Sequence, residues 1–241
     1  RRGEATQAAA DDSHVDVVIQ HLGEVKAPAP NTDLFFYFTR VTGYAERKAG
    51  ARKVMLVGHV VGRELFGSER SLLDMMDAVA AMGFNVVVAI PNTTNTAYLE
   101  RLKSATTAVC ILPYGWWRAP ARGDERAAAG FAHIIAAENI DILHANTIVL
   151  REPLLAARRM GVPVVVHARE LIQHDETLTA VLGRPAKQII EDVWDHTDLL
   201  IANSHATAAC FDTDTRRTSI VYNTADFDDL RSMPLPSDQG Q

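Results

Sequence analysis

The sequence lacks the features that mark several large classes of protein. Its 241 residues include only two cysteines, too few for the disulfide framework of a small secreted domain. No apolar run approaches the ~20 residues that a transmembrane helix needs, and no apolar signal segment opens the chain. Acidic residues (30) outnumber lysine and arginine (24), which argues against general nucleic-acid binding. We expect a cytoplasmic protein with reduced thiols; peripheral contact with the inner face of the membrane stays open. Since the chain does not begin with Met, we expect it to be a fragment.

Familiar nucleotide, metal and hydrolase motifs are also absent. The segment VGHVVGRELFGSERSLLDMM (57–76) begins as a buried strand and ends as an amphipathic helix. The loop between them has neither the G-x-G-x-x-G spacing of a dinucleotide site nor the Gly-Lys-Ser/Thr of a Walker loop. No G-x-S-x-G elbow occurs, and His144 and His167 have no carboxylate pair at metal-ligand spacing. What remains is a glycine that lets the backbone pass close to a ligand, followed by a helix start that favours an anion.

Continuous apolar runs alternate with helical patterns from residue 53 onward. Such runs, without strict alternation, are typical of strands buried on both faces of a parallel sheet. The predicted strands are 54–58, 84–91, 108–113, 141–145, 162–167, 198–202 and 218–222. The predicted helices are 68–82, 97–103, 124–138, 153–160, 186–196 and 204–211. The pattern predicts an α/β fold: a Rossmann-like, doubly wound, mostly parallel sheet of about seven strands with helices on both faces.

The two ends of the chain lack the alternation of predicted strands and helices that marks this domain. We interpret residues 1–52 as an N-terminal extension or linker of unknown role, although the aromatic run 34–38 could form a strand at an edge of the sheet. Residues 229–241 are polar and contain two prolines, which indicates a tail or an interdomain linker. The predicted domain therefore covers residues 53–228.

Polar residues follow the predicted strands at their carboxyl ends, where open α/β sheets bind ligands. Singly, each has a structural explanation, such as a helix cap or a buried histidine. Together, amides, imidazoles and one arginine suit a ligand rich in hydroxyl and phosphate groups. The segment PYGWWRAP (113–120) adds Trp116 and Trp117, which either stack on an acceptor or cover the core.

The order of these segments resembles the N-terminal domain of family 4 glycosyltransferases, which have the two-lobed GT-B fold. The matching pieces are KVMLVG, GSERSLLDMMDAVAAMGFNVVVAIP, IDILHANT, GVPVVVHARELI, DLLIANSHATAACF and SIVYNTADF. The resemblance implies retaining, metal-independent transfer of a sugar from a nucleotide-sugar to a glycan or lipid-linked acceptor, with no further cofactor. It also implies a second, C-terminal lobe that holds the nucleotide. Without that lobe, we expect no useful transferase activity from this chain.

The resemblance also implies roles for individual residues. The predicted catalytic residues are His144, Asn146 and Glu170. The predicted substrate-binding residues are Gly67, Ser68, Glu69, His167, Arg169, Asn203, Ser204, Asn223, Trp116 and Trp117. Among them, Gly67 would approach the donor phosphate or the reacting sugar, and Trp116 and Trp117 are the candidates for acceptor specificity.

Three departures from the family pattern keep other functions open. Phe66 stands where the family usually has a first glycine, Asn146 where many relatives have a second histidine, and 224–226 reads Thr-Ala-Asp. The alternatives are a lobe of a nucleotide-sugar epimerase and a non-catalytic binding module with the same fold. Fold alone cannot choose among them, because function depends on the site.

Overall fold

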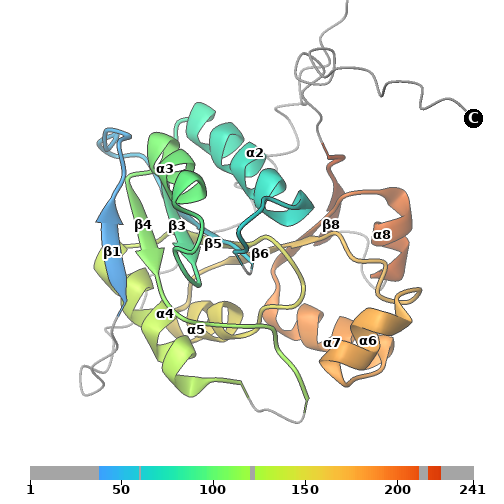
Figure 1. Cartoon of the computed structure of the whole chain (residues 1–241). Coiled ribbons are helices and arrows are strands. Elements are labelled where there is room, and N and C mark those ends of the chain that lie inside the picture. The colour runs from blue at the N-terminus through green and yellow to red at the C-terminus, as the bar shows by residue number, and fades with distance from the viewer. Residues whose placement is uncertain (1–37, 60, 120–122, 212–216, 224–241) are drawn as a thin grey trace, which may run out of the picture.

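The computed structural model describes residues 38–59, 61–119, 123–211 and 217–223. These residues form an eight-stranded sheet in the order β1-β4-β3-β2-β5-β6-β7-β8 (Figure 1). The strands are β1 (Thr39–Thr42), β2 (Lys53–Val57), β3 (Asn85–Ile90), β4 (Ala108–Ile111), β5 (Ile142–Ala145), β6 (Val164–Ala168), β7 (Leu199–Ala202) and β8 (Thr218–Ile220). All neighbouring strands are parallel except β1, which pairs antiparallel with β4. The predicted α/β sheet is confirmed.

The eighth strand, β1, lies in the segment that the sequence placed in the N-terminal extension. Thr39 pairs with Ile111 and Thr42 with Ala108, so β1 forms an edge of the sheet. The aromatic run 34–38, proposed as an edge strand, falls outside the described residues except for Phe38. The observed strand therefore begins just after that run.

Helices connect the strands and cover both faces of the sheet (Figure 1). They are α2 (Gly67–Ala81), α3 (Thr96–Ala105), α4 (Glu125–Glu138), α5 (Glu152–Met160), α6 (Glu176–Leu182), α7 (Ala186–His196) and α8 (His205–Cys210). All but α6 were predicted, within two residues at either end. Helix α6 has seven residues and buries only Leu178 and Leu182, too few positions for a helical period to be recognised.

Successive side chains of β2 belong alternately to two different hydrophobic cores. Met55 and Val57 belong to the core beneath α4, α5 and α7. Val54 and Leu56 belong to the core beneath α2 and α3. Because each strand presents successive side chains to opposite faces, this division makes the sheet doubly wound. Within the described residues, no helix is long and apolar enough to cross a membrane.

Candidate functional site

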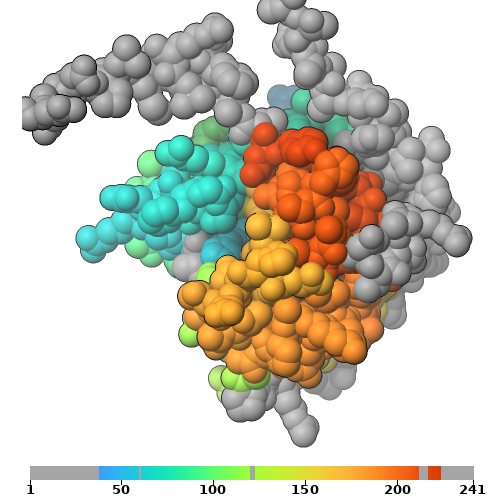
Figure 2. All heavy atoms as spheres, turned by 90° about the vertical axis from the view of Figure 1, so that its right-hand side faces the viewer, coloured from blue at the N-terminus to red at the C-terminus, as the bar shows by residue number. Residues whose placement is uncertain are grey.

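The strand order reverses between β2 and β5, and the candidate site lies at the carboxyl ends of these two strands. From β2 the chain runs through β3 to β4 on one side, and from β5 through β6 and β7 to β8 on the other. The loops that leave β2 and β5 therefore diverge, and a ligand can enter between them. Figure 2 faces this part of the molecule, with α2 in cyan and α8 in orange-red flanking residues near the end of β6.

Two glycines of the β2–α2 loop have different surroundings. A Cβ on Gly58 would meet Leu72 at 3.0 Å and Ile90 at 3.3 Å, so packing accounts for this glycine. A Cβ on Gly67 would meet nothing within 4 Å, and Gly67 has no positive φ that would require glycine. Gly67 is exposed at the first position of α2. The fold therefore does not require glycine at position 67. The lack of a side chain there leaves room for a ligand against the backbone.

The N-terminus of α2 already holds an acidic side chain. Glu69 is 4% exposed, and its Oε2 accepts hydrogen bonds from the Phe66 backbone N–H at 3.1 Å and from Ser68 Oγ at 2.8 Å. A carboxylate in the first turn also complements the helix dipole. The local role of Glu69 is to cap α2, and a ligand anion would compete with it for the positive end of the helix.

Arg169 contacts residues from three segments of the chain: the end of β5, strand β6 and the segment after β8. Its Nη2 donates to Asn146 Oδ1 at 2.9 Å and contacts His167 Nδ1 at 3.1 Å, and its Nη1 donates to Asn223 Oδ1 at 3.1 Å. Asn146 in turn donates through Nδ2 to the backbone oxygen of Ser68 at 3.0 Å, which ties the end of β5 to the start of α2. We name Asn146, His167, Arg169 and Asn223, with the adjacent His144, the Arg169 cluster.

Both histidines of the Arg169 cluster are buried and uncharged at neutral pH. Burial and then the charge of Arg169 lower the pKa of His144 to about 3. Burial, Arg169 and His144 lower the pKa of His167 to about 2. Arginine has no acceptor, so His167 Nδ1 must accept and its proton lies on Nε2. The Nε2 atoms of both rings have no hydrogen-bond partner in the described structure.

Glu170 lies beside the Arg169 cluster and is fixed by two donors. Its Oε1 accepts from Thr147 Oγ1 and its Oε2 from the backbone N–H of Arg169 at 2.8 Å. Thr147 is 2% exposed and follows β5 directly after Asn146. The sequence does not single out Thr147, because a threonine after a strand carries no distinctive signal.

Asn203 and Ser204 act locally at the start of α8. Ser204 Oγ accepts from the Thr207 backbone N–H at 3.1 Å, and Asn203 Oδ1 accepts from Thr207 Oγ1 at 2.6 Å. These contacts are those of a helix cap. Within the described residues, neither side chain hydrogen-bonds to the Arg169 cluster, and their substrate role stays a prediction.

The two tryptophans have different environments. Trp117 is 6% exposed, and the guanidinium carbons of Arg184 and Arg151 lie 3.6 Å and 4.1 Å from its ring centre. Two guanidinium groups this close to the ring, together with its burial, leave little of Trp117 for stacking on a ligand. Trp116 is half-buried and packs against His59, with ring centres 5.0 Å apart.

Trp116 lines a hollow of about 690 Å³ beside the start of α2. The other lining residues are His59, Gly62, Phe66, Ser68, Glu69, Gly115 and Arg118. Phe66 is 64% exposed, so the aromatic ring that replaces the expected glycine stands at this surface. His59 and Arg118 lie inside the segments 57–76 and 113–120, but nothing in the sequence separates them from ordinary loop residues.

Comparison with known families identifies the chain. The model of Glycosyltransferase Family 4 matches residues 67–229, more than half of the sequence. The chain belongs to glycosyltransferase family 4. The matched range contains every predicted site residue, including the Arg169 cluster. A search of the curated proteins found no match.

Solved structures share the fold of this family 4 domain. HepE of Anabaena, crystallised with UDP and glucose, is 19% identical, with a TM-score of 0.51 over 73% of this chain and 46% of HepE. A glycosyltransferase of Rickettsia africae is 13% identical, with a TM-score of 0.50 over 77% of this chain and 47% of that one. A UDP-N-acetylglucosamine 2-epimerase of Rickettsia bellii is 12% identical, with a TM-score of 0.46 over 70% and 44%. The chain thus spans about half the length of these proteins.

Proposed function

We propose that this chain is the acceptor-binding lobe of a retaining glycosyltransferase that moves a sugar from a nucleotide-sugar donor to a glycan or lipid-linked acceptor. The observation that carries the proposal is the Arg169 cluster, which gathers neutral imidazoles, amides and one guanidinium where the strand order reverses. Such groups suit sugar hydroxyls and a diphosphate leaving group. The UDP and glucose in the HepE crystal support a nucleotide-sugar as the donor.

The local contacts suggest a separate role for each of several residues in the site. Gly67 leaves the start of α2 open to the donor. The unpartnered Nε2–H of His167 is a donor for a sugar oxygen, and neutral His144 adds a second unpartnered imidazole nitrogen. Glu170, held by Thr147 and its own neighbouring backbone, is assigned to the acceptor hydroxyl, which it orients by accepting its hydrogen bond. We propose that the transfer requires no metal ion and that a second lobe completes the donor site.

An assay of the protein together with its second lobe tests this function. We expect UDP-sugars or GDP-mannose to be consumed only when an acceptor is present, with retention at the anomeric carbon and undiminished activity in EDTA. An epimerase would instead interconvert the UDP-sugar without acceptor. A non-catalytic module would leave every donor unchanged. Either of these results would overturn the proposal.

A pair of variants tests the assigned position of the donor. Gly67→Val places a bulky side chain in the open space at the first residue of α2, so we expect the KM for the donor to rise at least tenfold. The matched control is Thr96→Val, at the exposed first residue of α3. We expect both variants to keep the wild-type Tm. An unchanged donor KM for Gly67→Val would remove Gly67 from the donor site.

A further inference from the structure

A second hollow adjoins the one beside α2. It measures about 590 Å³, within the range of ~300–1,000 Å³ typical of small-molecule sites. Gly115, Trp116 and Arg118 line both hollows, so one loop borders the two. The rest of its lining is Trp117, Gly123, Asp124, Glu125, Arg126 and Glu152.

Glu152 lines this hollow and has a carboxylate oxygen without a partner. The residue is 5% exposed, and its Oε1 accepts from the Asp124 backbone N–H at 3.0 Å. Its Oε2 is buried and has no hydrogen-bond partner within the described ranges. Leaving a buried carboxylate oxygen unpaired is costly, so a ligand that donates a hydrogen bond there would be favoured.

Trp117 lines the same hollow and has a donor without a partner. The guanidinium groups of Arg151 and Arg184 lie against its ring. Its Nε1–H is buried and unpaired in the part of the chain that the structure describes. Buried indole N–H groups usually find an acceptor, and a ligand oxygen would supply one.

The surroundings of the hollow carry charges of both signs and do not select an ion of either sign. Three carboxylates (Asp124, Glu125, Glu152) and two guanidinium groups (Arg118, Arg126) border it, and two more guanidinium groups lie against Trp117. A hydroxyl group both donates and accepts hydrogen bonds. A polyhydroxyl ligand can therefore serve Glu152 and Trp117 together, while the half-buried ring of Trp116 offers an apolar surface to a sugar ring.

We propose that this hollow is a second saccharide subsite, in which Glu152 Oε2 accepts from, and Trp117 Nε1 donates to, hydroxyls of one sugar residue. The inference rests on the proposed function and extends it to the class of acceptor. We place the first acceptor sugar in the adjoining hollow beside α2, so the acceptor is a saccharide of at least two rings, with Trp116 at the boundary between the two hollows.

Binding of defined saccharides to the intact 241-residue chain tests the subsite. The probes are methyl glycosides of glucose, galactose, N-acetylglucosamine, mannose and rhamnose, arrayed beside disaccharides of the same sugars and followed by titration calorimetry. We expect disaccharides to bind at least tenfold more tightly than the single rings they contain. Equal affinity for one and two rings, or no binding by any saccharide, would overturn the proposal.

Two variants remove one hydrogen bond each. Glu152→Gln keeps an oxygen for the Asp124 N–H but loses the carboxylate, and Trp117→Phe keeps an aromatic ring against the guanidinium groups but loses the N–H. We expect each to weaken disaccharide binding roughly tenfold, as the loss of one buried hydrogen bond implies. The control is Glu191→Gln on α7, which is exposed and does not line this hollow.

The outcomes separate this inference from the proposed function. Folded variants that bind like the wild type would overturn the subsite, even where the protein transfers sugar. Disaccharide binding that depends on Glu152 would support the subsite, even where no nucleotide-sugar is consumed. If one variant fails to fold, the disaccharide affinity of the other variant tests the subsite. If both fail, the comparison of monosaccharide and disaccharide affinity in the wild type tests it.

Discussion

Arg169 satisfies three acceptors and adds to the effect of burial in keeping two neighbouring histidines neutral. Its guanidinium contacts Asn146, His167 and Asn223, and burial lowers its own pKa, an effect that Glu170 and Asp74 partly offset. A guanidinium stays charged even so, because its pKa in water is above 12. The charge beside buried imidazoles adds to burial in lowering their pKa values, so the cluster presents uncharged hydrogen-bonding groups to a ligand.

The neutral histidines make folding stability dependent on pH. The pKa is about 3 for His144 and about 2 for His167 in the folded chain, against about 6.5 in the unfolded chain. A lowered folded pKa contributes stability that is fully present above pH 6.5 and is lost as pH falls toward 3. At pH 5, we expect each histidine to reduce the free energy of unfolding by about 2 kcal/mol relative to pH 7.5.

Urea denaturation at pH 7.5 and pH 5 measures this loss. His144→Gln, which cannot take up a proton in this range, should lose less stability between the two pH values than the wild type. His174→Gln, at an exposed histidine, is the matched control and should keep the wild-type difference. An equal loss in His144→Gln and wild type would contradict the buried, neutral state of His144.

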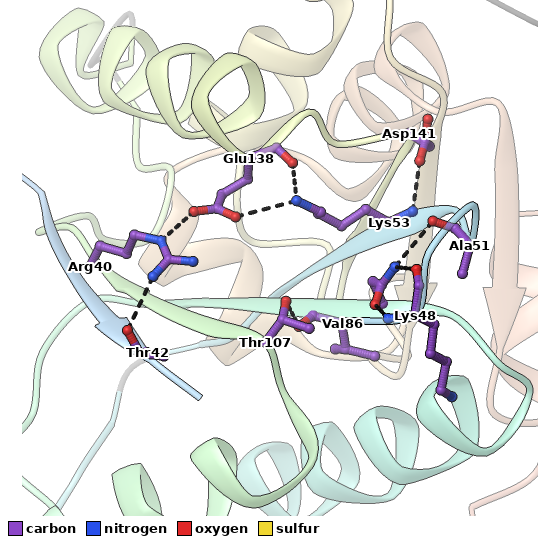
Figure 3. Close-up of polar contacts among 10 residues, drawn as sticks. Arg40, Thr42, Lys48, Ala51, Lys53, Val86, Thr107, Glu138 and Asp141 are labelled. Atoms are coloured by element: carbon purple, nitrogen blue, oxygen red, sulfur yellow. Dashed lines mark hydrogen bonds and ion pairs between the residues drawn. The ribbon is translucent and has the colours of Figure 1, made fainter. Parts of the chain in front are cut away.

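Among the elements, β1 is linked to β2 and α4 by an ionic cluster whose Lys53 and Glu138 are buried and whose Arg40 is partly exposed (Figure 3). Arg40 on β1 donates through Nε to Glu138 Oε1 at 2.5 Å, and Lys53 Nζ on β2 lies 3.4 Å from Glu138 Oε2. Lys53 and Glu138 are each 7% exposed. Burial alone would raise the pKa of Glu138, but its hydrogen bond with Arg40 and the charges of Arg40 and Lys53 outweigh it and lower that pKa. One carboxylate at the end of α4 thus joins two strands.

Glu138→Gln should therefore destabilise the chain by about 3 kcal/mol, since it leaves Lys53 buried without its carboxylate. The same helix offers a control in Glu125, whose pair with Arg159 is exposed to solvent. Glu125→Gln should cost less than about 1 kcal/mol. Urea denaturation of both variants at pH 7.5 measures the difference. Equal stabilities would show that the ionic cluster contributes no more than a surface pair.

The elements also show where sequence reasoning succeeds and where it stops. Long apolar runs such as those of β3 and β6 specify buried parallel strands, so seven strands and their order along the chain could be predicted. Strand β1 could not, because Thr39–Thr42 is an exposed edge strand whose place depends on a distant partner, β4. The polar ends of strands pointed to the site, but the hydrogen bonds of Arg169 and the enclosure of Trp117 depend on tertiary contacts that residue spacing does not encode.

At the scale of the whole molecule, the chain spans about half the length of the solved structures that share its fold. It covers 46% of HepE and 47% of the Rickettsia africae glycosyltransferase, and its own two cores lie on the two faces of one sheet. The Arg169 cluster reaches Asn223, which lies close to the end of the described chain. The Glu69 carboxylate already caps the positive end of α2, so a donor phosphate would compete with it there. These features support the proposal that a second lobe holds most of the donor nucleotide.

This arrangement predicts weak binding of the donor to the isolated chain. We expect UDP-glucose to bind with a Kd weaker than about 100 μM, or about −5.5 kcal/mol, because one side of the donor would face solvent. Titration calorimetry of the 241-residue chain measures this Kd, and a thermal scan that shows cooperative unfolding confirms that the protein titrated is folded. The same titration on a protein that includes the second lobe should give tighter binding. Low-micromolar binding by the isolated chain would place the donor site within this lobe and make Glu69 at the start of α2 the first residue to re-examine.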